Sequence, residues 1–240
     1  MLALGAAAAA VAVVVGTFVW LPRSEAQAHG EIYRTAAGEV REVALADGSS
    51  VLLNGASAIK VQLDGDVRHV TLNAGEALFD VAHDADRPFT VEAGAGEVTV
   101  LGTRFDLALN DDQVELEVSR GLVRFGAVGA DEDEAVLVRQ AQRSTLQGGT
   151  PTMPVAYAGP SEPEWRSGWV EVTDMPLAQL LPRLERWTTK TIELKDPALL
   201  EQRVAGRFML SEPGAVLSGL GAMYDFRVRE TDSAFVIERI

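Results

Sequence analysis

The chain reads IKVQLDGDVRHVTL from Ile59 to Leu72, and this stretch decides the fold. Apolar and polar residues alternate over residues 59–63, a turn pair follows at Asp64-Gly65, and the alternation returns over residues 67–72. Alternation with a period of two indicates a strand with one buried face. An Asp-Gly pair between two such segments is typical of a tight hairpin. The stretch therefore predicts two antiparallel strands.

Similar segments lie on both sides of this pair, at intervals of about 8–12 residues and separated by turn residues. They are residues 40–45, 50–53, 76–81, 89–91, 97–101, 105–109, 114–118 and 122–125. No helical period lasts for three turns between Tyr33 and Gly126. The protein is therefore expected to be mainly β, with an all-β domain of sandwich or solenoid-like form over residues 31–158.

A segment rich in Pro, Gly and Ser over residues 150–163 indicates a linker. Beyond it, residues 164–240 alternate between strand and helix patterns and predict two successive β-α-β units. Such an order makes a small α+β domain. The sequence thus predicts two folded parts of different class after the N-terminal segment.

Two helices are expected in this last part. The first is expected to be capped by Asp174 and the second, Pro213–Tyr224, by Ser211. The expected buried faces follow helical spacing and consist of Leu177, Leu180, Leu181, Leu184 and Trp187 in the first helix, and of Val216, Leu217, Leu220 and Met223 in the second.

Residues 2–21 form an apolar stretch that no charged residue interrupts. As a helix this stretch would span about 30 Å, the thickness of the hydrocarbon core of a bilayer. We expect a transmembrane helix over residues 1–22, ended by Pro22. A cleavable signal peptide is the alternative that stays open, because Ala26-Gln27-Ala28 has the form of a cleavage site.

Charge and cysteine content exclude several classes of function. The chain of 240 residues carries 21 Lys and Arg against 35 Asp and Glu, a formal net charge of −14. A nucleic-acid-binding protein needs a concentrated basic surface to contact phosphates, so this balance speaks against that class. The chain has no cysteine, which excludes disulfides, thiolate metal sites and cysteine nucleophiles.

The remaining polar motifs favour ordinary structural roles. The three histidines, His29, His69 and His83, do not show the spacing of metal ligands. Asp84 to Pro88 is expected to be a polar hairpin tip, and the acidic run over residues 131–134 a solvated loop. No serine lies in a G-x-S-x-G context. We expect no metal site, no cofactor and no enzyme that acts on an external substrate.

One dipeptide, Gly102-Thr103, is a candidate for self-cleavage. It lies between two apolar segments, and a threonine hydroxyl after glycine can attack the preceding carbonyl when the turn is strained. The resulting ester would hydrolyse and cut the chain. The alternative is a glycine at a β-bulge followed by a threonine that favours strand, and the residues alone favour that alternative.

Several ordered motifs lie within some 70 residues. They are Gly38-Glu39-Val40, LADGSSVLLN over residues 45–54, LNAGEALFDVA over residues 72–82, RPFTV over residues 87–91 and VLGTRF over residues 100–105. Together they resemble the FecR family of anti-sigma regulators. The resemblance implies an inner-membrane regulator with one transmembrane helix and the bulk of the chain in the periplasm. It also implies that Gly102-Thr103 is a plausible cleavage site, because some family members are thought to cut themselves at a Gly-Thr bond in this region.

The same resemblance implies two partners. One is an extracytoplasmic-function sigma factor, bound through a cytoplasmic segment that is missing from this sequence, and the other is an outer-membrane TonB-dependent transducer. Residues 164–240 are similar in order to the short N-terminal domain of secretins and TonB-dependent receptors, a docking module. Such a domain is expected to bind its partner, on a surface that the sequence does not identify. The alternative function is a stand-alone anchored or secreted β-rich envelope scaffold with no sigma partner.

Overall fold

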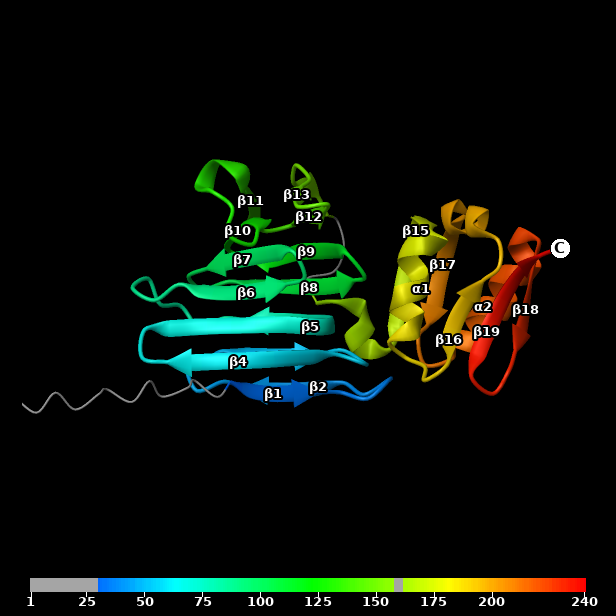
Figure 1. Ribbon diagram of the computed structural model, residues 1–240, viewed down its shortest axis with the longest axis horizontal. Helices are drawn as coiled ribbons and strands as arrows, with labels where there is room; N and C mark the ends of the chain where they lie inside the picture. The colour runs from blue at the N-terminus through cyan, green and yellow to red at the C-terminus, as the bar shows by residue number, and fades with distance from the viewer. Residues whose placement is uncertain (1–29, 158–161) are drawn as a thin grey trace, which may run out of the picture.

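The computed structural model of the protein describes residues 30–157 and 162–240. Within these ranges the chain forms a β-rich domain followed by a smaller α+β domain (Figure 1). The helices in the described ranges are all too short or too polar to cross a membrane. The transmembrane helix expected over residues 1–22 lies outside the described residues, as do Ala26-Gln27-Ala28 and His29.

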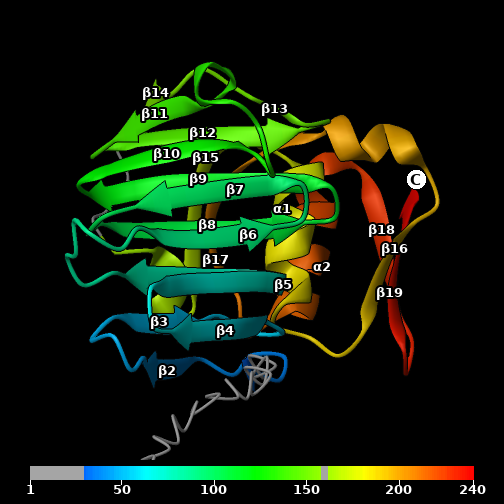
Figure 2. The same cartoon turned by 60° about the vertical axis from the view of Figure 1, so that its left-hand side comes forward.

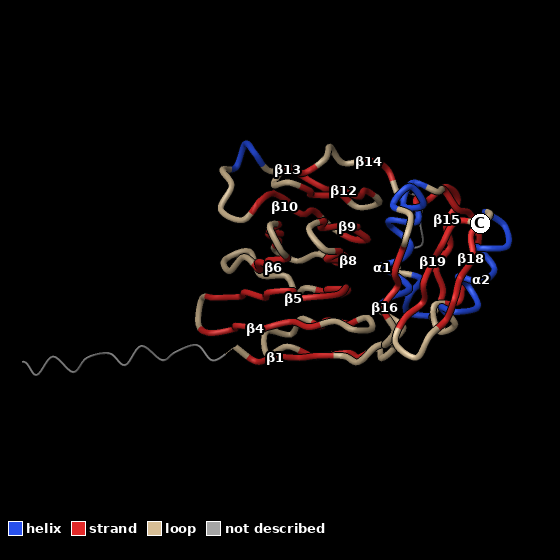
Figure 3. The backbone as a smooth tube through the Cα atoms, turned by 45° about the vertical axis from the view of Figure 1, so that its right-hand side comes forward, coloured by secondary structure: helices blue, strands red, loops and turns tan. Residues whose placement is uncertain are grey.

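The first domain consists of strands and loops, apart from one short 3-10 helix, η1 (Glu132–Glu134) (Figure 3). Its strands are β1 (Glu31–Arg34), β2 (Arg41–Ala44), β3 (Ser50–Leu53), β4 (Ala58–Asp64), β5 (Val67–Asp80), β6 (Phe89–Ala93), β7 (Gly96–Val100), β8 (Arg104–Asn110), β9 (Gln113–Arg120), β10 (Leu122–Ala127), β11 (Val136–Arg139), β12 (Gln142–Gln147), β13 (Thr150–Pro151) and β14 (Val155–Ala156). The prediction of a mainly β protein is confirmed.

The strands form two sheets that face one another, and β5 belongs to both. Sheet A has the order β1-β4-β5-β6-β7-β10-β11, and sheet B runs β2-β3-β5-β8-β9-β12 with β13 and β14 beyond it. The first half of β5 pairs with β4, and its second half pairs with β3 and β8. Gly75 lies where β5 passes between the sheets, at φ +86°, and a Cβ atom there would lie 2.2 Å from the Ser57 hydroxyl oxygen. Only glycine fits this crossing without strain.

The space between the sheets is filled by the apolar side of each strand. Phe79 of β5 and Phe105 of β8 stack in its centre, with ring centroids 5.0 Å apart, and both are fully buried. Each buried aromatic side chain of this kind contributes about 1.5–3 kcal/mol through apolar burial. The alternation that begins at Ile59 is the reason, because every second residue of β4 and β5 points into this core.

The hairpin predicted from Ile59 to Leu72 is confirmed as the antiparallel pair β4 and β5. The prediction that Asp84 to Pro88 is a hairpin tip is wrong. This segment connects β5 to β6, which are paired in parallel. Parallel neighbours require a crossing connection, so the loop passes over an end of the sandwich. The sequence pattern shows which residues face the core but not which strand is the neighbour.

The second domain contains strands β15 (Trp169–Pro176), β16 (Thr191–Leu194), β17 (Arg203–Met209), β18 (Phe226–Glu230) and β19 (Ala234–Arg239), α-helices α1 (Leu177–Glu185) and α2 (Pro213–Tyr224), and 3-10 helices η2 (Glu164–Ser167) and η3 (Pro197–Glu201). Strand and helix alternate along the chain in the order predicted. The strands that flank α1 lie in different sheets, however: β15 pairs with β17, and β16 pairs in parallel with β19 beside β18. The expectation of two simple β-α-β units is therefore corrected.

Both helices bury most of their predicted apolar faces, but their expected caps are wrong. Asp174 lies within β15 and forms an ion pair with Arg203, so the strand continues to Pro176 and the helix begins after it. In α2 the residue before the helix is Glu212 rather than Ser211, because Pro213 occupies the first helical position. Met223 is 60% exposed, which contradicts the prediction that it faces the core. Trp187 lies beyond the end of α1 and packs on the same core half-buried.

Candidate functional site

The Gly102-Thr103 bond lies in the short connection between β7 and β8. Thr103 is 3% exposed, and its hydroxyl oxygen is buried with no hydrogen-bond partner among the described residues. Backbone bonds hold the chain on both sides: the Val81 amide donates to the Thr103 carbonyl (2.9 Å), and the Asp84 amide donates to the Leu101 carbonyl (2.8 Å). A buried hydroxyl without a partner is uncommon, and it lies next to the bond that the sequence singled out.

Gly102 and Thr103 are closely packed by their neighbours. A Cβ atom on Gly102 would lie 2.6 Å from Nδ1 and 2.7 Å from Cα of His83, so the histidine packs directly on this glycine. A Cβ atom on Gly121, at φ +91°, would lie 2.6 Å from the Thr103 methyl carbon. No larger residue fits either glycine position without displacement of a neighbour. The packing therefore fixes the threonine side chain beside the Gly102 peptide group.

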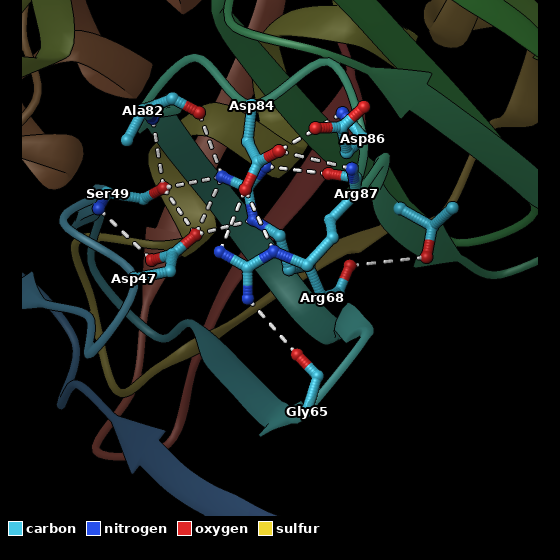
Figure 4. A network of polar contacts seen from close by, with 9 residues as sticks. Asp47, Ser49, Gly65, Arg68, Ala82, Asp84, Asp86 and Arg87 are labelled. Carbon is cyan, nitrogen blue, oxygen red and sulfur yellow. Dashed lines mark hydrogen bonds and ion pairs between the residues drawn. The ribbon is translucent and has the colours of Figure 1, made fainter.

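The loop that carries His83 is held by a buried arginine, Arg68 of β5 (Figure 4). The Arg68 guanidinium donates to the Asp47 carboxylate (2.8 Å), the Ala82 carbonyl (2.8 Å) and the Arg87 carbonyl (2.9 Å). Its ion pair with Asp47 is almost fully buried, with side chains 1% and 5% exposed. Although burial opposes it, the hydrogen bond from Arg68 holds the pKa of Asp47 below its ordinary value. Arg68 thus fixes both ends of the segment between β5 and β6.

We expect Arg68→Lys to lower the free energy of unfolding by about 2 kcal/mol. A lysine ammonium keeps the charge but cannot donate to Asp47 and both carbonyls from one planar group, and each hydrogen bond from a charged donor contributes about 1.5–3 kcal/mol. Urea unfolding of the full chain measures the change. Arg139→Lys, at an exposed arginine, is the control. An Arg68→Lys value within about 0.5 kcal/mol of the wild type would contradict the role given to this network.

The residue after Thr103 connects the candidate bond to the second domain. The Arg104 guanidinium contacts Asp80 at 3.3 Å and Glu162 at 2.6 Å, and Glu162 also pairs with Arg166. Glu162 is the first described residue after position 157. The start of β8 is therefore attached to the start of the second domain by charge-assisted hydrogen bonds.

A second polar cluster lies between the two domains, on the outer face of sheet B. Glu76 of β5, Asp106 of β8, and Glu115 and Glu117 of β9 lie on this face, and we refer to these four residues as the acidic face. Strand register places Asp106 opposite Glu117 and next to Leu78. Glu76 and Asp106 are only 6% and 8% exposed, because the second domain covers them.

Helix α1 and the residue just after it bring two arginines to the acidic face. Arg186 forms an ion pair with Glu76 at 3.0 Å, with both side chains less than 10% exposed, and it also contacts the Asn110 side chain. Arg183 pairs with Glu115 at 3.0 Å. The Gly38 amide donates to the Arg186 carbonyl (2.9 Å), so the backbones of the two domains also meet. In both Figure 1 and Figure 2, α1 lies against the sandwich.

Apolar contacts complete the interface. Leu78 and Leu52, which point outward from sheet B, pack into the core of the second domain. The Trp165 indole N–H of η2 donates to the Asp106 carboxyl at 3.2 Å. A cavity of about 100 Å³ remains beside this contact, lined by acidic-face residues together with Tyr157 and Trp169. The two domains thus share a buried interface with both charged and apolar parts.

The pKa values of the carboxyl groups on the acidic face are shifted in opposite directions. Burial alone would raise the pKa of Glu76, but Arg186, Arg183 and the Asn54 side-chain amide outweigh it and hold this pKa below its ordinary value. Burial raises the pKa of Asp106 well above its ordinary value, and the charges of Glu76 and Glu117 add to the effect. Burial also raises the pKa of Glu117. Within this pair the surroundings therefore favour the charged form of Glu76 and the protonated form of Asp106.

Sequence reasoning found Gly102 and Thr103 but missed the acidic face. Its four carboxylates stand at alternate positions in amphipathic strands, where a polar residue is expected to face water. A usable signal was the presence of Leu52 and Leu78 at the same outward positions. The other candidates remain apart: His69 bonds Thr90 on sheet A, and within residues 30–157 and 162–240 no group of three possible metal ligands occurs.

The sequence model of the family described as "FecR protein" matches residues 31–124. Residues 31–124 belong to the FecR family. This FecR domain begins at β1, contains Gly102-Thr103 and all four residues of the acidic face, and ends within β10. Strands β11 to β14 of the sandwich and the second domain lie beyond the matched range. A comparison with curated proteins gave no significant match.

Two crystal structures of candidate anti-sigma factors from Parabacteroides distasonis have the same fold as this chain. One is 22% identical with a TM-score of 0.73, and the other is 21% identical with a TM-score of 0.74. Each comparison covers 88% of this chain and 99% of the other. At this identity the likeness establishes the fold alone. The extent of the match shows that a fold like that of the sandwich together with the second domain occurs in those structures too.

Proposed function

We propose that this protein is an anti-sigma regulator in which the second domain receives a signal and the FecR domain passes it on. The observation that carries the proposal is the FecR match over residues 31–124. The architecture supports it, because the fold of 88% of the chain is shared with two crystal structures described as those of a candidate anti-sigma factor. The chain acts by binding partners rather than by turnover of an external substrate.

The finer proposal is a relay across the cell envelope. The apolar residues 1–22 anchor the protein in the inner membrane, the remainder lies in the periplasm, and a TonB-dependent transducer in the outer membrane binds the second domain. Strands β16 and β18 each lie at one side of the three-stranded sheet and pair only with β19 among the described strands. Such edges allow a partner to add a strand, which is a common mode of docking. The sigma factor is then controlled on the other side of the membrane.

A cell-based reporter tests this proposal. Transcription from a promoter of an extracytoplasmic-function sigma factor, the partner proposed here, is measured in three strains. In these strains the gene for this protein is present, deleted, or restored by a form that lacks residues 164–240. An anti-sigma regulator raises reporter output by tenfold or more when deleted, and loss of the second domain uncouples the output from the inducing signal. If neither change alters transcription, the protein is instead an envelope scaffold with no sigma partner.

A second candidate activity is cleavage of the chain at Gly102-Thr103. The specific observation in its favour is the buried Thr103 hydroxyl, which has no hydrogen-bond partner among the described residues and lies beside a glycine packed against His83. In this step the hydroxyl oxygen attacks the Gly102 carbonyl carbon, the bond to the Thr103 nitrogen breaks, and the hydroxyl proton passes to that nitrogen. Water then hydrolyses the ester, leaving a carboxylate on Gly102 and a free hydroxyl and amine on Thr103.

A further inference from the structure

When the second domain docks, it buries more carboxyl groups than it pairs with guanidinium groups. The acidic face brings four carboxyl groups into the interface, and α1 and the residue after it supply two guanidinium groups. Arg186 pairs with Glu76, and Arg183 pairs with Glu115. Among the described residues Asp106 has no ion pair, and its partners are the Trp165 indole N–H and the Glu76 carboxyl. It lies at the centre of the face and is 8% exposed.

An ionised carboxylate at this position would be costly. Moving a charge out of water without a cation costs several kcal/mol, and such groups normally become neutral instead. The titratable and charged groups that face Asp106 or line the cavity beside it come from both domains. They are Glu76 from β5, Glu115 and Glu117 from β9, Arg143 from β12, Tyr157 after β14, Glu164 from η2, Glu171 from β15 and Arg183 from α1. Its nearest charged neighbours along the strands, Glu76 and Glu117, are negative, so they add to the cost of ionising it.

The cover over Asp106 comes from the second domain. Trp165, Val170 and Leu210 belong to that domain and line the cavity beside Asp106. If the domain moved away, Asp106 would lie on an open sheet face with access to water, where a carboxyl group has its ordinary pKa of about 3.9. The docked and undocked forms therefore differ in proton content.

We propose that docking of the second domain on the acidic face is coupled to uptake of a proton by Asp106, so that the interface closes more tightly as the pH falls from neutral to mildly acidic. The sign follows from linkage: the protonated form is favoured in the docked state, so a lower pH favours docking. The effect ends where Asp106 is protonated in both states. Below that pH the ion pair of Glu76 is lost and docking weakens, because the pKa of Glu76 is lowered by docking. Burial also raises the pKa of Glu117, so protonation of Glu117 favours docking in the same way as protonation of Asp106.

The proposal concerns the contact between the two domains and does not depend on a sigma factor or a transducer. Proton uptake by Asp106 would make the contact between the two domains respond to the pH around the protein. An isosteric change isolates that response, because Asp106→Asn has the shape and donor capacity of the protonated carboxyl and does not titrate.

Distances between paired spin labels on the full chain measure docking directly. The chain has no cysteine, so Gln140→Cys on the sandwich and Met223→Cys on α2, both exposed, give a single labelled pair. Between about pH 5 and pH 8 the open population of the wild type should rise, with a limiting slope of about tenfold per pH unit for one proton. Asp106→Asn should stay more closed than the wild type over this range and keep only the weaker pH dependence that Glu117 contributes. Asp112→Asn, at an exposed carboxylate, should follow the wild type.

A second measurement covers the case in which the open population is too small to detect. The Asp106 carboxyl carbon is titrated by NMR in the wild type and in Ala108→Trp, which places a large side chain beneath the second domain at a position 4% exposed. The proposal requires a pKa well above the ordinary value in the wild type and a return toward it in Ala108→Trp. Equal pKa values in the two proteins, or an Asp106→Asn variant that opens with pH as the wild type does, would overturn it.

Discussion

The full chain purified with Thr103→Ala should give one uncut band on a denaturing gel, whereas the wild type should give two fragments that meet between residues 102 and 103. Alanine has no hydroxyl to attack the Gly102 carbonyl, so cleavage is lost completely rather than slowed. Mass spectrometry should identify a new C-terminus at Gly102 and a new N-terminus at Thr103. This effect is the largest that we expect from any single substitution in the sandwich.

Thr103→Ser is the matched control for this experiment, because serine keeps the hydroxyl and should still be cut. On a native sizing column the cut wild type should run as one species. The break falls between β7 and β8, and the fragments remain interleaved through the pairs β5 with β8 and β7 with β10. A wild-type chain that stays intact under all conditions would remove self-cleavage from the account and leave Gly102-Thr103 as a closely packed connection.

The second large effect concerns the domain interface. Arg186→Met should lower the free energy of unfolding by about 3–5 kcal/mol, because it leaves the Glu76 carboxylate buried without its cation. Urea unfolding followed by intrinsic fluorescence and by circular dichroism measures the loss. We expect the second domain to unfold before the FecR domain in this variant.

Two further variants separate the buried ion pair from a general loss of packing. Glu76→Gln in the Arg186→Met background should recover part of the free energy of unfolding, because the variant no longer buries an unpaired carboxylate. Arg229→Met breaks an exposed pair with Glu238 at 3.5 Å and should cost less than about 1 kcal/mol. If Arg186→Met lowered the free energy of unfolding no more than Arg229→Met does, the ion pair of Arg186 with Glu76 would not hold the two domains together.

Local chemistry explains how much of the fold could be predicted. Alternation from Ile59 to Leu72 identified β4 and β5, because a strand in a sandwich must place every second side chain in the core. Leucines at helical spacing identified α1 for the same reason. Pairing was harder to predict. The parallel contact of β5 with β6 and of β16 with β19 depends on crossings that no short-range signal records.

The candidate site was predicted in part. Gly102 and Thr103 stood out because their order alone suggests chemistry, and the structure adds the buried hydroxyl and the contact with His83. The acidic face could not be predicted from local pattern, since Glu76 and Asp106 occupy positions that normally face solvent. Their burial depends on Arg186, which is 110 residues from Glu76 in the sequence (186 − 76).

The measurement that tests the central proposal most directly is the affinity of the full chain for the N-terminal signalling domain of a TonB-dependent transducer, the partner proposed for the second domain. Isothermal titration calorimetry should show one-to-one binding with a Kd in the micromolar range or lower. A micromolar Kd corresponds to a binding free energy of about −8 kcal/mol, and a lower Kd to a more negative value. A chain lacking residues 164–240 should not bind. Absence of binding by the full chain at several hundred micromolar would contradict the account of this protein as a signal-receiving regulator.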